Sequence, residues 1–186
     1  LALAFQQSGG GRLSLQTIRG TRHFEKTGYV AHHGQLWSVF ADAAPVGPDY
    51  QPGHAHADTL NVEAAYRGKR VFVDPGTYSY DDNDTRSYSR STRAHNTVSI
   101  DGEDSSEVWK IFRVGRRAYP EDVEFHSDDN GFVLSASHCG YRHLKGSPAH
   151  KRIVDVGKRE LVLSDEVSGE EEHEVSGGLL IAPCWK

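Results

Sequence analysis

The chain has no methionine and only two cysteines, Cys139 and Cys184, among its 186 residues. Two cysteines this far apart do not build a disulfide framework or a cysteine-type zinc site. The sequence also lacks an apolar run long enough to span a bilayer, so we expect no membrane span. Because even an initiator methionine is missing, we expect the chain to be an internal piece or a processed product of a longer protein.

An overall excess of positive charge is missing as well. The net charge is −5, whereas surfaces that bind nucleic acid usually carry a clear basic excess, so we expect no nucleic-acid partner. Between Arg86 and Arg117 the balance reverses, with seven basic residues against four acids. This local excess would suit an acidic sugar, although an ordinary solvated face explains any single arginine equally well.

Helical periodicity is absent too, since no segment reads as an amphipathic helix of ordinary length. Short segments with the length and the β-branched or aromatic content of strands are present instead. They are residues 36–40, 59–66, 70–73, 97–100, 132–136, 152–156 and 160–163. Turn residues separate them, as at Asp101-Gly102 and Asp129-Asn130-Gly131. This spacing predicts an all-β fold, an antiparallel sandwich or a barrel-like sheet.

Histidine and aspartate gather in three short segments. His54 and His56 are two residues apart, so in an extended segment they point to one side, which Asp58 shares. Asp74 and His95 follow from what read as neighbouring strands. Zinc favours imidazole nitrogen and carboxylate oxygen, so His56, Asp74 and His95 with one water or substrate oxygen would form a chemically complete site. The pattern leaves open which of the first three residues faces the metal.

Each of these residues also has an ordinary explanation when it is considered alone. Asp74 precedes Pro75-Gly76 and could simply form a turn, and His95 could be a hydrogen-bonded histidine of the core. As one ordered set, they favour a metal site.

The order of these motifs resembles the C-terminal β domain of heparinase II/III-like polysaccharide lyases. The resemblance rests on GHAHADTL, VFVDPGTYSY and YSRSTRAHNTV, and it continues through SHCGYRHLKGSPAHKR and LVLSDEVSG. It implies that residues 28–186 form an antiparallel β-sandwich of this type and that residues 1–27 form a lead-in segment or an interdomain linker. It further implies that the chain is a fragment of a longer protein in which an N-terminal α-toroid accompanies the sheet domain.

The resemblance also implies roles for single residues. In zinc-binding members of that family, the second histidine of the HxH motif, the aspartate of the DPG motif and the histidine of the HN motif hold the metal. Carried over, these ligands are His56, Asp74 and His95, and His54 lies in the catalytic cleft. Tyr80 and Tyr88 are the further catalytic candidates, because tyrosine and histidine are suitable proton carriers. The candidates for substrate binding are Arg86, Arg90 and Arg93.

For function, the resemblance implies a bacterial periplasmic or secreted lyase that cleaves an acidic, uronate-containing polysaccharide by β-elimination. The α-toroid would complete the cleft, so we expect this chain alone to be inactive. One alternative is a non-catalytic, zinc-stabilised module that binds carbohydrate or helps to process a surface polysaccharide. Another is a metal-dependent hydrolase that uses zinc-bound water. Only the lyase would give a product with a new C=C bond that absorbs ultraviolet light.

Overall fold

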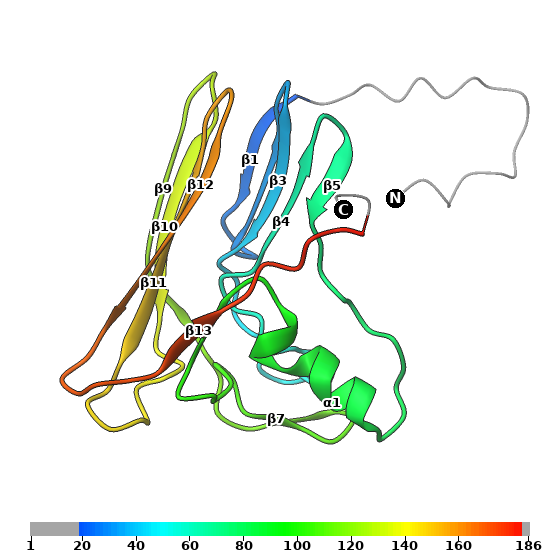
Figure 1. Ribbon diagram of the computed structural model, residues 1–186, viewed down its shortest axis with the longest axis vertical. Coiled ribbons are helices and arrows are strands. Elements are labelled where there is room, and N and C mark those ends of the chain that lie inside the picture. The colour runs from blue at the N-terminus through cyan, green and yellow to red at the C-terminus, as the bar shows by residue number, and fades with distance from the viewer. Residues whose placement is uncertain (1–18, 184–186) are drawn as a thin grey trace, which may run out of the picture.

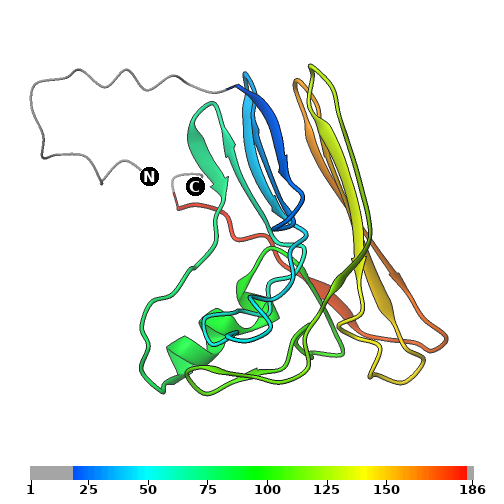
Figure 2. The same ribbon diagram turned by 180° about the vertical axis from the view of Figure 1, so that it is seen from behind.

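The computed structural model describes residues 19–183. Within these residues, antiparallel strands make up most of the fold, together with one short α-helix. Two larger sheets stand side by side, and the helix lies with several connecting loops at one end of them (Figures 1 and 2). The predicted all-β antiparallel sandwich is therefore confirmed.

The first sheet has five antiparallel strands in the order β1-β2-β3-β4-β5. Their bounds are β1 Gly20–Phe24, β2 Tyr29–His33, β3 Trp37–Asp42, β4 Val62–Tyr66 and β5 Lys69–Phe72. β1 lies inside the expected lead-in segment of residues 1–27, where it pairs with β2. Residues 1–18 of that segment lie outside the described part of the chain. The division of the chain at residue 28 stays a prediction.

The second sheet has four antiparallel strands in the order β12-β11-β10-β9. Their bounds are β9 Pro120–Ser127, β10 Phe132–His138, β11 Ala149–Val156 and β12 Leu161–Ser168. Two small antiparallel sheets pair β6 Val98–Ile100 with β13 Val175–Gly177, and β7 Val108–Trp109 with β8 Arg113–Val114. The helix α1 Asp84–Arg90 and a 3-10 turn at Thr92–Ala94 precede β6.

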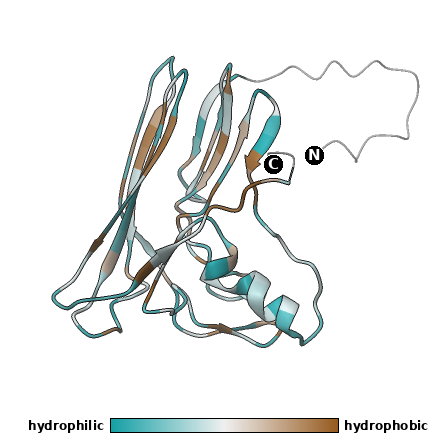
Figure 3. Ribbon diagram, viewed as in Figure 1, coloured by the Kyte–Doolittle hydropathy of each residue, from teal (hydrophilic) through white to brown (hydrophobic). Residues whose placement is uncertain are grey.

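The main core lies between the two large sheets. On β11, Val154 and Val156 are buried while the intervening Asp155 is exposed, which is the alternation of a strand with one face in the interior. Buried residues of both sheets join in one cluster: Val30, Val39, Ala41, Ala43, Leu60, Val62, Ala64, Phe132, Leu134, Ala136, Val154 and Val156. Figure 3 shows apolar stretches on strands of both sheets. Burial of this surface is the main source of stability.

Every strand expected from the sequence overlaps a strand of the structure. The strand expected at residues 59–66 begins only at Val62, because Leu60 has a left-handed φ of 66° that interrupts the extended backbone. The strands β1, β2 and β9 were missed, as were the short β7, β8 and β13. β1 and β9 are edge strands, whose polar and charged residues hide the alternation. Among the described residues, no helix is long and apolar enough to cross a membrane.

Candidate functional site

Three segments meet beside α1, at one end of the first sheet (Figure 1). His56 lies in the loop between β3 and β4, Asp74 follows β5, and His95 follows the 3-10 turn. Ala57 fastens the first loop to the others: its N–H donates to the Arg90 carbonyl at 2.8 Å, and its carbonyl accepts from Thr92 Oγ1 at 2.8 Å. Residues far apart in the sequence are thereby held at one place.

The expectation that His54 and His56 share one side of an extended segment is wrong. The segment forms a turn in which the Ala55 N–H donates to the Pro52 carbonyl at 2.9 Å. As a result His56 is buried, whereas His54 is exposed. Different exposure is what a metal ligand and a cleft residue would need, and those two roles stay predictions.

His95 is the most enclosed histidine of the site, with 2% of its surface exposed. Its Nδ1 lies 2.6 Å from Asp74 Oδ2. Burial acts to lower the pKa of His95, but the hydrogen bond to Asp74 and the nearby carboxylates raise it above its ordinary value. Nε2, at the other side of the ring, is buried and has no hydrogen-bond partner among the described residues. A buried imidazole nitrogen without a partner is a candidate metal donor.

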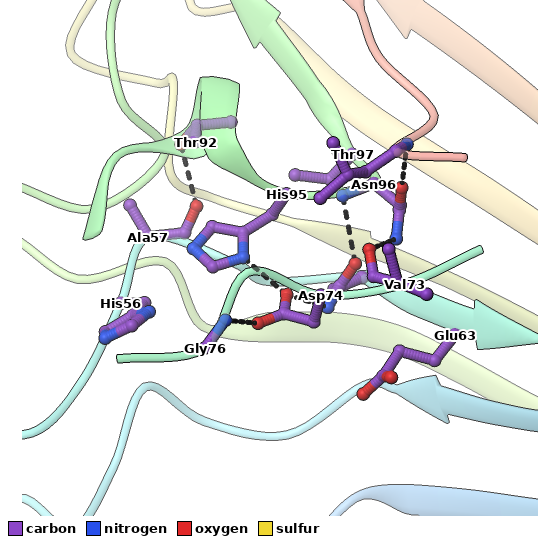
Figure 4. Close-up of polar contacts among 12 residues, drawn as sticks. His56, Ala57, Glu63, Val73, Asp74, Gly76, Thr92, His95, Asn96 and Thr97 are labelled. Atoms are coloured by element: carbon purple, nitrogen blue, oxygen red, sulfur yellow. Dashed lines mark hydrogen bonds and ion pairs between the residues drawn. The ribbon is translucent and has the colours of Figure 1, made fainter. Parts of the chain in front are cut away.

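Donor atoms of His56, Asp58 and His95 all lie within 4.8 Å of one another. We call these three residues the metal triad. Its carboxylate is Asp58, whereas the sequence predicted Asp74. Figure 4 shows Asp74 beside His95, bonded to the ring nitrogen Nδ1. Carboxylates in that position commonly orient a histidine whose other nitrogen binds metal. The structure thus contains a candidate His/Asp metal group, and direct ligation by Asp74 stays a prediction.

The surroundings of the metal triad are acidic. Burial raises the pKa of Asp58 to about 6, and the charge of Asp74 adds to this effect. Burial and the charge of Asp58 likewise raise the pKa of Asp42 well above its ordinary value. Carboxylates that resist ionisation in a protein interior would be stabilised as anions by a bound cation. On the side of these carboxylates, the charges therefore favour a cation.

The surroundings of His56 favour its neutral imidazole form. Its Nε2 lies 3.2 Å from Arg86 Nη1 and 3.3 Å from Thr77 Oγ1. Burial, followed by the charges of His95 and Arg86, lowers the pKa of His56 to about 4. Metals bind the neutral form of histidine, so His56 needs no deprotonation at physiological pH before it can act as a ligand.

Two asparagines that the sequence reading did not single out hold the site together. Asn61 donates from Nδ2 to Asp74 Oδ2 at 2.9 Å, and its Oδ1 accepts from the Asn96 N–H at 3.0 Å. Asn96 is fully buried, and its Nδ2 donates to the carbonyls of Val62 and Val73. Asn96 was visible in the HN motif, but its contacts come from segments that only the fold brings together.

A second group of functional candidates lies on the exposed side of the site. The His54 ring meets Tyr80 edge-on at 5.5 Å and Phe112 at 5.7 Å between centroids, and Tyr80 and Phe112 stack at 5.7 Å. We call these three residues the aromatic cluster. His54 also lines a cavity of about 250 Å³ together with Asp42, His56 and Asp58. No signal in the sequence pointed to Phe112. Tyr88 is exposed on α1, and its ring does not stack with this cluster in the part of the chain that the structure describes.

The expected substrate-binding arginines are divided by the fold. Arg90 is buried, and within residues 19–183 its guanidinium donates to backbone carbonyls: those of Ala55, Trp109, Lys110 and Arg113. Arg86 is buried too, contacting His56 and donating to the Ile111 carbonyl at 3.1 Å. Arg93 is exposed. Burial disfavours Arg90 as a substrate-binding residue and suits it to holding loops together.

Of the seven basic residues in the local excess, only Arg93, Lys110 and Arg113 are exposed. Besides Arg86 and Arg90, Arg116 donates to the carbonyls of Ser105 and Gly140. Arg117 pairs with Asp49 at 3.1 Å. Most of this positive charge is used within the protein, which counting charges along the sequence could not reveal.

The chain is similar to known polysaccharide lyases. The profile of the family described as Heparinase II/III-like, C-terminal, matches residues 17–185. Among solved structures, heparan sulfate lyase HepC from Pedobacter heparinus is 17% identical to this chain, with a TM-score of 0.70. The matched region covers 91% of this chain and 25% of the HepC chain. A structure described as heparinase III is 22% identical with a TM-score of 0.69, covering 90% of this chain and 25% of its own. No curated protein matches. The chain thus spans about a quarter of the length of these lyases.

Proposed function

The chain belongs to the heparinase II/III-like C-terminal family, and we propose that it is the β domain of a polysaccharide lyase that cleaves uronic-acid-containing glycans by β-elimination. The observation that carries the proposal is the arrangement of His54. This exposed histidine lies in the aromatic cluster and lines the cavity that also reaches His56 and Asp58. A proton carrier, aromatic surface and a buried polar centre occur together there.

β-Elimination has three chemical requirements. The C5 carboxylate of the uronate must be neutralised, the C5 proton must be removed, and the leaving glycosidic oxygen must receive a proton. His54 is the residue that we assign to the base or to the carboxylate contact, and Tyr80, whose ring meets it edge-on, is the further proton carrier. Tyr88 and Arg93 are exposed and remain available to a long substrate.

We further propose that the metal triad binds zinc and that the metal stabilises the loops. Two imidazoles and a carboxylate match the donors that zinc prefers, and the orphaned Nε2 of His95 fits such a bond. When bound, the ion would supply positive charge that ties the loop carrying His56 and Asp58 to the segment carrying His95. Asp74 either orients His95, as its present contact indicates, or joins the ligands as the family motif implies.

The chain supplies only part of the cleft in this proposal. An N-terminal α-toroid would provide the remaining catalytic groups, because all three demands of the elimination must be met at one sugar ring. A misplacement of about 1 Å can cost about 10²-fold in rate, so an incomplete cleft gives little activity. The isolated chain should therefore bind acidic oligosaccharide weakly without cleaving it. For the complete protein we propose a bacterial periplasmic or secreted location, where such polysaccharides are met.

Replacement of His54 tests the proposal most directly. In the intact enzyme, His54→Ala should lower turnover by about 10²–10⁴-fold, because general acid–base groups contribute that much. Metal content and melting temperature should stay unchanged, since His54 is outside the metal triad. The assay follows the ultraviolet absorbance of the new C=C bond on heparan sulfate, hyaluronan, chondroitin and alginate. His126→Ala, at an exposed histidine of β9, is the matched control.

Retention of full activity by His54→Ala would contradict the catalytic assignment. Cleavage without ultraviolet absorbance would indicate a hydrolase. The aromatic cluster gives one specific reason to consider a non-catalytic carbohydrate-binding module, since exposed rings can hold sugars without chemistry. Binding of acidic oligosaccharide by the intact protein, with no turnover of any of these polymers, would support that module instead.

A further inference from the structure

A network of buried polar side chains lies on the inward face of the second sheet, and none of its members belongs to the metal triad. His150 and Arg152 lie on the inward face of β11 and are 0% and 4% exposed. In the strand register, His150 is opposite His138 of β10 and Arg152 is opposite Asp165 of β12. Neither the resemblance nor the proposed function gives these four residues a role.

The hydrogen bonds assign a direction to this network. The Gly140 N–H donates to His138 Nδ1 at 3.1 Å, so the proton of that ring is on Nε2. His138 Nε2 then donates to His150 Nδ1 at 3.2 Å, and His150 Nε2 donates to Asp165 Oδ1 at 2.7 Å. Both rings are neutral in this arrangement. The chain of donors ends on the carboxylate of Asp165.

Asp165 in turn fixes Arg152 through two bonds. Arg152 Nε donates to Asp165 Oδ1 at 2.7 Å, and Nη2 donates to Oδ2 at 2.8 Å. Such a bidentate contact holds the guanidinium plane in one orientation. The remaining nitrogen, Nη1, is thereby directed out of the second sheet, where it donates to the Leu60 carbonyl at 2.8 Å and also to the Asn96 carbonyl.

These two carbonyls belong to the segments that carry the metal triad. Leu60 is two residues after Asp58, and its φ of 66° is a strained value for leucine. Asn96 directly follows His95. One nitrogen atom of Arg152 therefore bridges the backbones that position two of the three candidate ligands.

We propose that Arg152, held by Asp165, is a positioning residue that sets the distance between Asp58 and His95 for metal binding. This role rests on the proposed metal function of the triad. Burial of an ion pair is a poor way to gain stability, because the loss of hydration offsets the attraction between the charges. The pair does fix geometry across the two sheets. Lysine cannot replace it, since an ammonium group lacks the planar fork that makes these contacts at once.

The test is Arg152→Lys in the full-length protein, with Arg142→Lys as the matched control. Arg142 makes a bidentate pair with Glu121 near the surface of the same sheet. Zinc affinity is measured by chelator competition, and the ligand field by the absorption spectrum of the cobalt(II) form. We expect Arg152→Lys to bind zinc about 10–100-fold more weakly, as losses around metal ligands do, and to change the cobalt spectrum. The control should change neither.

Wild-type affinity and spectrum in Arg152→Lys would overturn the positioning role while leaving the metal site intact. A wild-type protein that binds no zinc or cobalt would refute the metal site itself, and the positioning role for metal with it. Should Arg152→Lys fail to fold, Asp165→Asn keeps the shape and removes the charge. It must show the same loss of affinity, together with faster amide hydrogen exchange confined to residues 58–61 and 95–97. Unchanged affinity in Asp165→Asn overturns the proposal.

Discussion

The inward face of β11 changes character along its length. Val154 and Val156 belong to the apolar cluster between the sheets, whereas Arg152 and His150, on the same face, lie among polar partners. We call the part of the interior around Val154 and Val156 the apolar half and the part around His150 and Arg152 the polar half. Folding gains free energy from the apolar half through burial alone, at about 25 cal/mol per Å² of apolar surface. The polar half must satisfy every buried donor and charge before it contributes.

The location of the polar half explains why such a costly interior is useful. It faces the backbone of Leu60 and Asn96, next to the candidate metal ligands, and aliphatic side chains there could not bond to those carbonyls. An apolar core tolerates small shifts between layers, while directed hydrogen bonds do not. We infer that the apolar half holds the sheets together and that the polar half sets the position of the site.

Truncation of the apolar half should have the largest effect on stability. Leu134 is 3% exposed in the main cluster, so Leu134→Ala should lower the free energy of unfolding by about 2–5 kcal/mol. The zinc affinity of the folded protein should be retained. Denaturant unfolding and chelator competition measure the two quantities. Val133→Ala, at the exposed neighbouring residue, is the control. A loss of affinity in Leu134→Ala would show that the two halves are not separable.

Removal of a candidate ligand should instead abolish zinc binding first and lower stability only through the lost metal. His95→Ala should abolish stoichiometric zinc and with it the metal-dependent stability, which is about 2.7 kcal/mol at a free metal concentration a hundred times Kd. Chelation of the wild type should lower the melting temperature, and chelation of His95→Ala should not. Comparison of Asp58→Asn with Asp74→Asn then identifies the carboxylate ligand: its replacement should reduce metal content more. A wild type whose melting is unaffected by chelation would refute the stabilising metal.

The polar half should also make the protein sensitive to acid. Burial, with the charge of Arg152, lowers the pKa of His138 to about 3. Between the ordinary histidine pKa of about 6.5 and that value, the unfolded state binds a proton that the folded state does not. The free energy of unfolding should therefore fall as pH decreases, by up to about 1.4 kcal/mol per pH unit for this one group.

His138→Gln removes this titration while keeping a donor for His150, so the pH dependence of unfolding should become shallower between about pH 6 and pH 4. His126→Gln, at an exposed position, should leave the slope unchanged. Asp165 adds a further loss in stronger acid, because its bonds from His150 and Arg152 outweigh burial and hold its pKa well below the ordinary value. Equal slopes for His138→Gln and the wild type would contradict the assignment of His138 as a buried neutral ring.

The two halves differ in how well the sequence predicts them, because one depends on a local pattern and the other on partners that only the fold brings together. The apolar half was predictable, because alternation on segments such as residues 132–136 and 152–156 is a local property of strands. The polar half was not. Arg152 and His150 continue the inward-facing alternation, but their partners come from β10, β12 and two distant loops. The sequence indicated His56, Asp74 and His95 as a metal group, while the place of Asp58 beside the two histidines, the turn before His56 and the contact between His95 and Asp74 needed the fold.

The smallest effect on stability is expected at Arg93, the exposed member of the three arginines proposed for substrate. Arg93→Ala should change the free energy of unfolding by less than about 0.5 kcal/mol, as surface replacements usually do. If Arg93 contacts a uronate or sulfate group, KM should rise about tenfold with little change in kcat, since that contact binds substrate and transition state alike. Arg90→Lys is the informative partner variant, because it should weaken the loops around Ala55 and Trp109 without a selective effect on KM. An unchanged KM in Arg93→Ala, measured on the most acidic polymer that the enzyme accepts, would leave substrate recognition by this chain to the aromatic cluster.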